Sequence, residues 1–189
     1  PDGESLMALA IFLDAHAVAG DAALLAQVRA GLLALSADND AVLARFAAAI
    51  DRFGEEDAHW WSRLLARDAA GRDGMDPKKQ GIFPLVHGVR ALALRARLPQ
   101  TSTAARLQAL AGAGLMDRAE ATDVLQSLNF FMQLKLQAVL HEMESGRPVS
   151  GRIDPARLSS LERDLLKDTL DIVKRFRRLV QSRFHLDQL

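Results

Sequence analysis

The sequence contains no cysteine, which excludes disulfide bonds, thiolate metal sites and cysteine nucleophiles. It also lacks a net charge, because 24 basic side chains balance 24 acidic ones. A nucleic-acid-binding domain normally carries a clear basic excess, so we expect no nucleic-acid partner. A helical nucleic-acid binder that uses Arg175 to Arg183 is the alternative, but it would need a basic stripe that no acidic residue interrupts. Any basic site must therefore be local, and the absence of cysteine fits a cytoplasmic location.

Long apolar runs are missing as well. The most apolar stretch, Leu6 to Leu13, is far shorter than the roughly 20 residues of a membrane-spanning helix, and no basic region precedes it. We therefore expect no membrane contact. The composition, 49% hydrophobic and 25% charged, is typical of a globular protein with one compact core. Because the chain starts at Pro1 and enters an apolar segment almost at once, we expect it to be a piece of a longer protein.

Common catalytic signatures are absent too. The sequence has no GxSxG elbow, no P-loop and no dinucleotide-binding fingerprint. The histidines are far apart and none forms the i, i+4 pair of a helical zinc site; they are His16, His59, His87, His141 and His185. We therefore predict neither catalytic residues nor metal ligands in this chain.

Apolar residues recur at helical spacing along most of the sequence, which predicts an all-α bundle of about six to seven helices. The predicted apolar faces run over Leu24–Leu35, Leu43–Phe53, Leu85–Ala96, Leu107–Leu110, Val124–Met143 and Leu165–Val180. Leu6 to Val18 fits a helix better than a buried strand. Residues 60–78 contain a polar, glycine-bearing turn and fit a loop or a short β-hairpin.

Capping residues mark the ends of most of these helices. Helix starts are predicted at Asp21, at Asp38 or Asn39, within Thr101–Thr103, at Asp117 with Glu120, and at Ser159 with Glu162. Pro84 suits the first turn of a helix, and Pro99 stops the same helix. The short break before residue 40 predicts that the first two amphipathic helices pack antiparallel.

Two lysines and a glycine precede the helix that Pro84 opens. A helix start has unpaired backbone N–H groups and a partial positive charge, so Lys78, Lys79 and Gly81 could hold a phosphate or carboxylate there. The alternative is that both lysines are solvated loop charges. Asp14, at the edge of an apolar segment, fits either a helix end or a polar site.

Several segments resemble the nucleotidyltransferase substrate-binding domain of bacterial signalling proteins related to PII uridylyltransferase and glutamine synthetase adenylyltransferase. The matching positions are Lys78 or Lys79, Gly81, Ile82, Pro84–Val86, Arg90 with Ala93 and Leu94, and Thr103 with Arg106 and Leu107. The resemblance continues through residues 129–136 and 153–170. At the front, the segment that contains Asp14, Gly20 and Asp21 is similar to the family's Asp-x-Arg-x-x-x-Gly-Asp pattern.

The chain departs from the family pattern in three respects. His16 stands where arginine is usual, and His87 stands where an acidic residue is common. The Gly-Ser motif and the Asp-x-Asp pair of the family's catalytic core are missing. Because phosphoryl transfer needs metal-bridging carboxylates, we expect the chain to be inactive alone.

The resemblance implies a role and a site. Residues 1–67 would be a helical segment that follows the catalytic core, and residues 68–189 the substrate-binding domain, packed as one unit with it. The parent would transfer a uridylyl or adenylyl group from a nucleoside triphosphate, with Mg²⁺, to a protein acceptor, and could also carry CBS or cyclic-nucleotide-binding domains. The expected substrate contacts are Lys78, Lys79, Gly81 and Arg90, with Asp14 beside the catalytic domain.

A rival interpretation is a non-catalytic helical module that docks neighbouring domains or a second copy of the chain as a homodimer. It predicts no nucleotide binding. It also predicts that Lys78 and Lys79 lie in open solvent, away from any concave surface.

Overall fold

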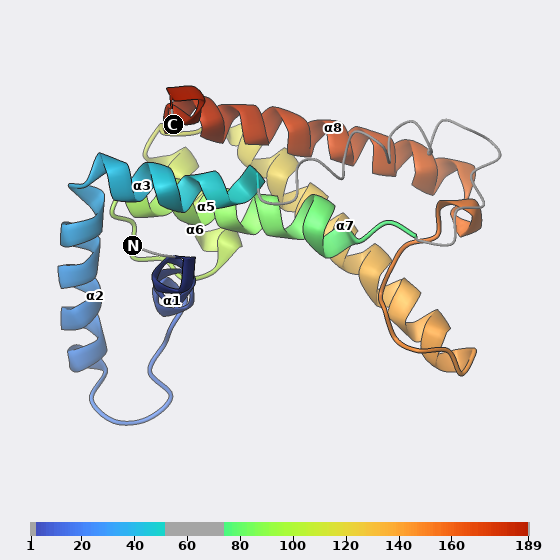
Figure 1. The fold of residues 1–189 in the computed structure, drawn as a ribbon, viewed down its shortest axis with the longest axis horizontal. Helices are drawn as coiled ribbons and strands as arrows, with labels where there is room; N and C mark the ends of the chain where they lie inside the picture. The colour runs from blue at the N-terminus through green and yellow to red at the C-terminus, as the bar shows by residue number, and fades with distance from the viewer. Residues whose placement is uncertain (1–2, 52–73, 189) are drawn as a thin grey trace.

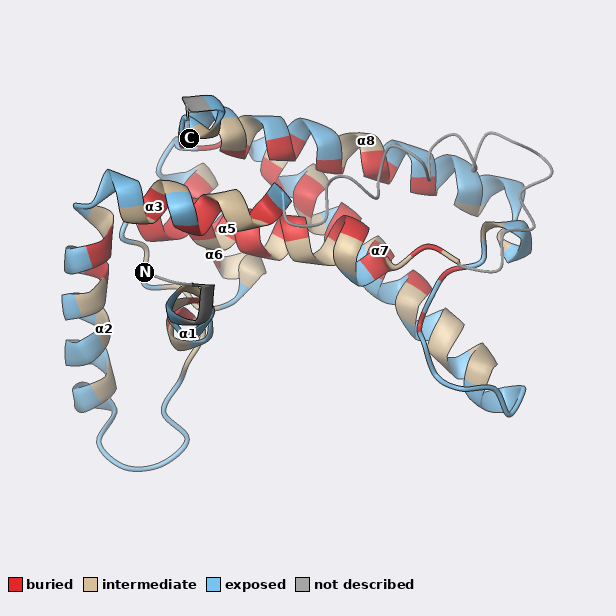
Figure 2. Cartoon of the chain, in the orientation of Figure 1, coloured by how far each residue is buried: buried red, intermediate tan, exposed pale blue. Residues whose placement is uncertain are grey.

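Helix α5 (Phe83–Arg95) lies at the centre of the structure, a computed structural model that describes residues 3–51 and 74–188 (Figure 1). Nine of its 13 residues are buried. Helices α3 (Asp40–Ala47), α6 (Thr103–Gly112) and α8 (Ser160–Arg183) all pack against it. Close approach to α8 requires Gly88, because a Cβ there would lie 2.6 Å from the ring of Phe176. Figure 2 shows the buried residues gathered where these helices face one another.

The described part of the chain forms an all-α bundle, as the periodicity predicted. Its remaining α-helices are α1 (Gly3–Leu13), α2 (Ala22–Ala37) and α7 (Arg118–Glu144). Shorter helical turns cover Ala48–Asp51, Lys78–Ile82, Pro155–Arg157 and Leu186–Gln188, the second of them a π-helix that leads into α5. The predicted hairpin falls mostly outside the described residues. Within them, Met75 instead forms an isolated antiparallel bridge with Ile153.

Most of the predicted helix starts are confirmed by side-chain caps. A side-chain oxygen of the capping residue accepts a backbone N–H at each of Asp21, Asn39, Ser102, Asp117 and Ser159. Only the last forms the complete reciprocal capping box with a glutamate, Glu162. Each cap satisfies backbone donors that the first turn of a helix leaves without a partner.

The first two predicted helices do not pack antiparallel. Figure 1 shows α2 standing at a steep angle to α3 and pointing away from the central helices. The predicted core face of α2 is correspondingly wrong, because Leu24 is 62% exposed and Leu35 is 79% exposed. Helix α1 also ends earlier than predicted, at Leu13 instead of near Val18. Periodicity identified the helices but not which apolar face meets the core.

Helix α7 is buried over its first half and exposed toward its end (Figure 2). Val124 and Phe131 are fully buried, whereas Leu136 is 57% exposed and Met143 is 62% exposed. The end of α7 diverges from α8 in Figure 1, which agrees with the greater exposure of its apolar residues there. In the part of the chain that the structure describes, no helix combines the length and apolar character that crossing a membrane requires.

Candidate functional site

Three residues that are far apart in the sequence meet in a partly buried ion cluster. Asp14 follows α1, Arg90 lies on α5 and Arg106 lies on the first turn of α6. Arg90 donates from Nε to Oδ1 of Asp14 at 3.3 Å and from Nη2 to Oδ2, so it forms a two-pronged pair. Arg106 donates from Nη1 to the same Oδ1 at 2.7 Å. One carboxylate thus joins helices α5 and α6 to the end of α1.

Arg106 is the best-fixed member of this cluster. Its side chain is only 3% exposed, against 13% for Arg90 and 37% for Asp14. Its Nη2 donates to the backbone carbonyl of Leu13 at 3.0 Å, and its Nε donates to that of Gln100 at 2.9 Å. A cation next to the last carbonyls of α1 is also favoured by the helix dipole. These three hydrogen bonds hold the guanidinium of Arg106 in one orientation, with Asp14 as its only side-chain partner among the described residues.

Arg29 of α2 adds a third guanidinium. It donates to the backbone carbonyl of Ala15, the residue that follows Asp14, and its charge acts on Arg106. Together, the three guanidinium groups and the one carboxylate of this region carry an excess of two positive charges. Nε of Arg29 is buried and has no hydrogen-bond partner among the described residues. The cluster therefore has both charge and donor capacity left for a further anion.

Burial and ion pairing act in opposite directions on the charges of this site. Burial acts to raise the pKa of Asp14, but hydrogen bonds and charges from Arg90 and Arg106 outweigh it and lower that pKa. Burial also lowers the pKa of Arg106, and the hydrogen bond to Asp14 only partly compensates. The guanidinium still stays protonated at neutral pH. Both groups are thus ionised, and their pairing offsets part of the cost of burying the two charges.

The lysines predicted as anion contacts lie elsewhere. At about 1.5 Å per residue, Lys78 is roughly 18 Å along the helix from Arg90. The backbone N–H groups of Lys78 and Lys79 donate to Oδ1 of Asp76, at 2.9 and 3.4 Å, so a carboxylate of the chain itself already caps this helix start. The structure does not bring Arg90 to this helix start, and the role of the lysines stays a prediction.

Gly81 has a clear packing role. It is buried, and a Cβ at this position would lie 2.4 Å from the ring of Phe131 on α7. Glycine is therefore required for the π-helix to lie against α7. This explanation needs no ligand.

The two histidines that depart from the family pattern differ in environment. His16 is exposed. His87 is buried, with Nε2 2.6 Å from the backbone oxygen of Phe46 and its ring stacked on Phe83 at a centroid distance of 5.3 Å. We interpret His87 as a core residue.

Sequence reasoning missed Arg29 and Arg106 as site residues. Arg106 stood in one of the segments that carried the family resemblance, but only Arg90 was selected from them. Arg29 had a signal of its own, because it is the only charged residue between positions 22 and 37. Its acceptor in the structure is the backbone carbonyl of Ala15, two residues after the end of α1.

A family model described as "Putative nucleotidyltransferase substrate binding domain" matches residues 40–184. No curated protein and no solved structure matches the chain. The match spans α3 to α8 and contains Arg90 and Arg106, whereas Asp14 and Arg29 precede it. Since it covers more than half of the sequence, the chain belongs to the family of nucleotidyltransferase substrate-binding domains.

Proposed function

We propose that this chain is the substrate-binding helical part of a signal-transduction protein that transfers a uridylyl or adenylyl group. The observation that carries the proposal is the convergence of Arg90 and Arg106 on one carboxylate, in a chain of this family. Paired guanidinium groups are suited to oxyanions, because each presents several donors in a rigid plane. The substrate group held here is a phosphate of the nucleotide or an acidic group of the protein acceptor.

Asp14 has two functions in this proposal. Its carboxylate neutralises part of the arginine charge and thereby keeps Arg106 stable in its buried position. It is also 37% exposed, so the cluster can be reached from one side. An incoming oxyanion binds beside Asp14 and uses the donors of Arg29 and Arg90 that Asp14 does not occupy.

The transfer chemistry belongs to a catalytic domain outside this chain. In the described residues, no three histidine, aspartate or glutamate side chains gather as a metal site, and guanidinium groups do not bind Mg²⁺. The residues of the cluster therefore do not fit the metal ion, and Mg²⁺ and the nucleoside triphosphate would be held mainly by the parent protein. This chain positions the substrate but does not turn it over.

Isothermal titration calorimetry tests the proposal directly. The chain is titrated with ATP and with UTP in the presence of Mg²⁺, and the titrations are repeated with Arg90→Gln. We expect saturable heat that weakens at least tenfold, about 1.4 kcal/mol, in the variant. Arg178→Gln on the exposed face of α8 removes the same charge and should leave binding unchanged. Absence of heat with both nucleotides, or equal affinities in Arg90→Gln, would contradict the proposal.

A homodimer through α7 is a second candidate function. Exposed apolar residues follow one another on this helix at positions 132, 136, 140 and 143. Together with Val139, three of them have the 4, 3, 4 spacing of a coiled-coil seam: Met132, Leu136 and Met143. This stripe carries no charge, so a second copy of the same helix suits it.

A further inference from the structure

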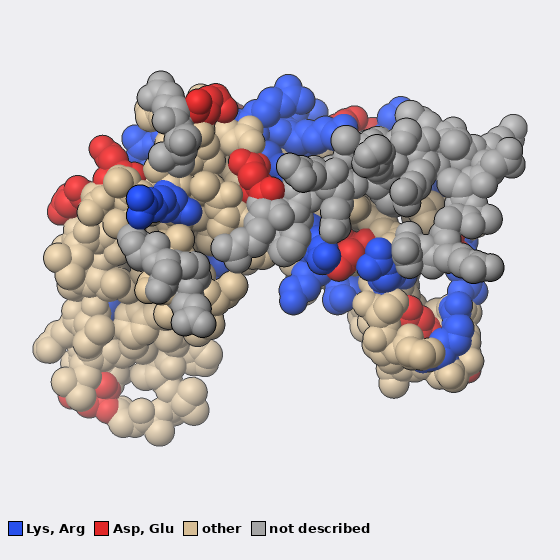
Figure 3. Space-filling view, viewed as in Figure 1, with Lys and Arg blue, Asp and Glu red and all other residues tan. Residues whose placement is uncertain are grey.

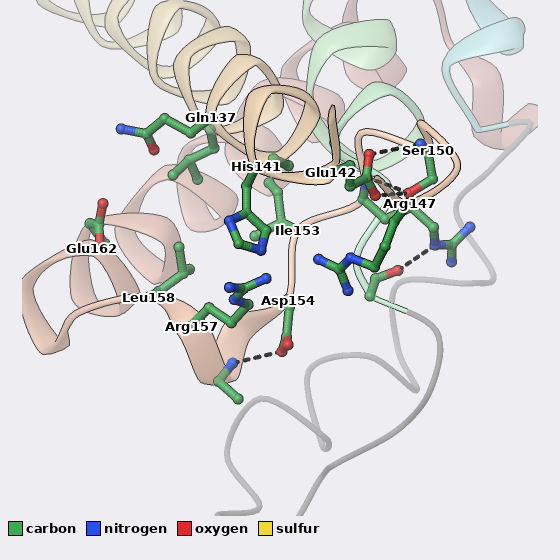
Figure 4. Close-up of a pocket in the computed structure, with 15 residues that line it drawn as sticks. Gln137, His141, Glu142, Arg147, Ser150, Ile153, Asp154, Arg157, Leu158 and Glu162 are labelled. Atoms are coloured by element: carbon green, nitrogen blue, oxygen red, sulfur yellow. Dashed lines mark hydrogen bonds between the residues drawn. The ribbon is translucent and has the colours of Figure 1, made fainter. Parts of the chain in front are cut away.

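A cavity of about 640 Å³ lies where the end of α7, residues 147–158 and the start of α8 meet (Figure 4). In Figure 1 this region is at the opposite end of the long axis from α1 and the Asp14 cluster. The volume is within the range of about 300–1,000 Å³ that is usual for small-molecule sites. On the face shown in Figure 3, basic side chains gather toward this end, whereas the α1–α2 arm is mostly uncharged.

The three carboxylates that line the cavity all bind the polypeptide itself. Glu142 accepts from the backbone N–H groups of Ser150 and Gly151, each at 2.8 Å, and from the Ser150 hydroxyl. Asp154 accepts from the N–H of Ala156 at 3.0 Å. Glu162 accepts from the N–H and the hydroxyl of Ser159, both at 2.8 Å, in the capping box of α8. The three carboxylates therefore stabilise the backbone segments that form the walls of the cavity.

The basic side chains are arranged differently. Figure 4 shows Arg147 and Arg157 pointing into the cavity, with the ring of His141 close to Arg157. A third arginine, Arg152, is turned to the wall, where its Nε donates to the backbone carbonyl of Gly74 at 2.7 Å. The three arginines and three carboxylates balance in formal charge, so selectivity for an anion comes from orientation. Arg147 and Arg157 point inward, while each carboxylate accepts hydrogen bonds from the walls through at least one of its oxygens.

One side of the cavity is apolar. Leu134 and Ala138 of α7 form part of it, and Ile153 and Leu158 form the rest. Leu134 and Ile153 are each 2% exposed, so their side chains are fixed in the core. A ligand that fills the cavity therefore meets donors on one side and hydrocarbon on the other.

The walls are held in place before any ligand binds. Ile153 and Met75 exchange two backbone hydrogen bonds, both of 2.8 Å. Gly151 has φ +64°, a backbone conformation that favours glycine, and it lies against Lys135 and Val139 of α7. Together with the Glu142 hydrogen bonds, these contacts fix the segment that carries the arginines, which lowers the entropic cost of binding.

We infer that this cavity binds a phosphate monoester with an apolar or aromatic body. Two guanidinium groups match the several terminal oxygens of a phosphate, whereas a carboxylate is satisfied by one. The hydrocarbon wall accommodates the esterified body. The residues of this cavity are not part of the Asp14 cluster, so the inference does not depend on the proposed function.

Calorimetric titration of the chain with phenyl phosphate, inorganic phosphate and benzoate tests the inference. Phenyl phosphate should bind saturably and at least tenfold more tightly than either of the others. Arg147→Gln and Arg157→Gln should each weaken it at least tenfold, whereas Arg178→Gln on the exposed face of α8 should not. Both cavity arginines are exposed, so the variants should keep the wild-type thermal midpoint, which is measured alongside.

Three outcomes would overturn the inference. The first is the absence of saturable phenyl phosphate binding to the wild-type chain. The second is an unchanged affinity in both arginine variants, which would place the ligand elsewhere. The third is equal binding of inorganic phosphate, which would show that the apolar wall does not contribute and that the ligand is not an ester.

Discussion

Arg106 donates at once to the carboxylate of Asp14, at 2.7 Å, and to the backbone carbonyl of Leu13, at 3.0 Å. One buried guanidinium on α6 therefore fixes the end of α1, 92 positions away in the sequence. The link also places the Asp14 carboxylate where it meets Arg90. We therefore expect that loss of this link lowers the free energy of unfolding, whether or not a ligand is bound.

We predict that Asp14→Asn destabilises the fold by about 1–3 kcal/mol, because it leaves the buried Arg106 charge without its counter-ion. Urea unfolding measures the change. Asp38→Asn is the matched control, since Asp38 pairs with Arg97 on the surface with 67% and 54% of the two side chains exposed. That change should stay below about 0.5 kcal/mol. Equal effects of the two substitutions would show that the Asp14 cluster is not a stabilising link.

The same variant has a defined pH dependence. The pKa of Asp14 lies below its ordinary value of 3.8, because the arginine partners outweigh the effect of burial. Its contribution is therefore fully present above pH 3.8 and is lost as the pH falls through the folded-state pKa. The difference in unfolding free energy between wild type and Asp14→Asn should shrink below about pH 4. A difference that grows in acid would contradict this assignment.

Glu142 should remain mostly ionised at pH values well below the ordinary glutamate pKa of 4.5. Hydrogen bonds from the Ser150 hydroxyl and from the Gly151 and Ser150 amides lower its pKa from 4.5 to about 2. Since the folded-state pKa is depressed, the stabilisation is present above pH 4.5 and is lost as the pH falls toward 2. Carboxyl-carbon NMR shifts should report a midpoint near 2 for Glu142. The midpoint should return toward the ordinary value in Ser150→Ala, which removes the hydroxyl.

Gly81→Ala should destabilise the fold by about 1–3 kcal/mol, because the added methyl group would overlap the ring of Phe131 in the core. Gly31→Ala is the matched control. Gly31 lies in α2 with no atom within 4 Å of an added Cβ, so alanine should stabilise that helix by up to about 1 kcal/mol. Thermal unfolding of both variants checks the signs. A neutral Gly81→Ala would remove the packing explanation for this glycine.

The double variant Lys78→Ala with Lys79→Ala tests the helix-start hypothesis from the sequence. Because Asp76 already accepts both backbone N–H groups, we expect nucleotide affinity to change less than threefold, well below the effect of Arg90→Gln. Calorimetry under the same conditions measures it. A tenfold loss would restore the lysines as the main phosphate contacts and make the Arg90 cluster secondary.

Local signals in this sequence predicted local structure well. The caps at Asp21, Asn39 and Ser159 follow from side chains that act on neighbouring backbone groups, and all three are present. The faces of α2 and of the end of α7 could not be predicted this way. Leu24 and Leu136 fit a helical period as well as buried residues do, and only the tertiary arrangement decides whether another element covers them.

The candidate site was predictable only in part for a related reason. Asp14 and Arg90 were selected separately, and no local pattern indicates that they form a pair. Their contact depends on how α1 crosses α5, which periodicity does not specify. The family resemblance placed Arg106 in a matching segment, yet its contact with Asp14 became visible only once the helices were arranged in space.

The exposed stripe on α7 gives the last prediction. If a second copy covers Met132, Leu136 and Met143, then Leu136→Glu should dissociate the dimer, because a charge in a coiled-coil seam faces its own copy. Light scattering during gel filtration measures the mass, which should halve from twice 20.6 kDa. Leu161→Glu on α8 is the matched control, since Leu161 is 76% exposed and lies outside the stripe. A wild-type chain that runs as a monomer at high concentration would reject the homodimer.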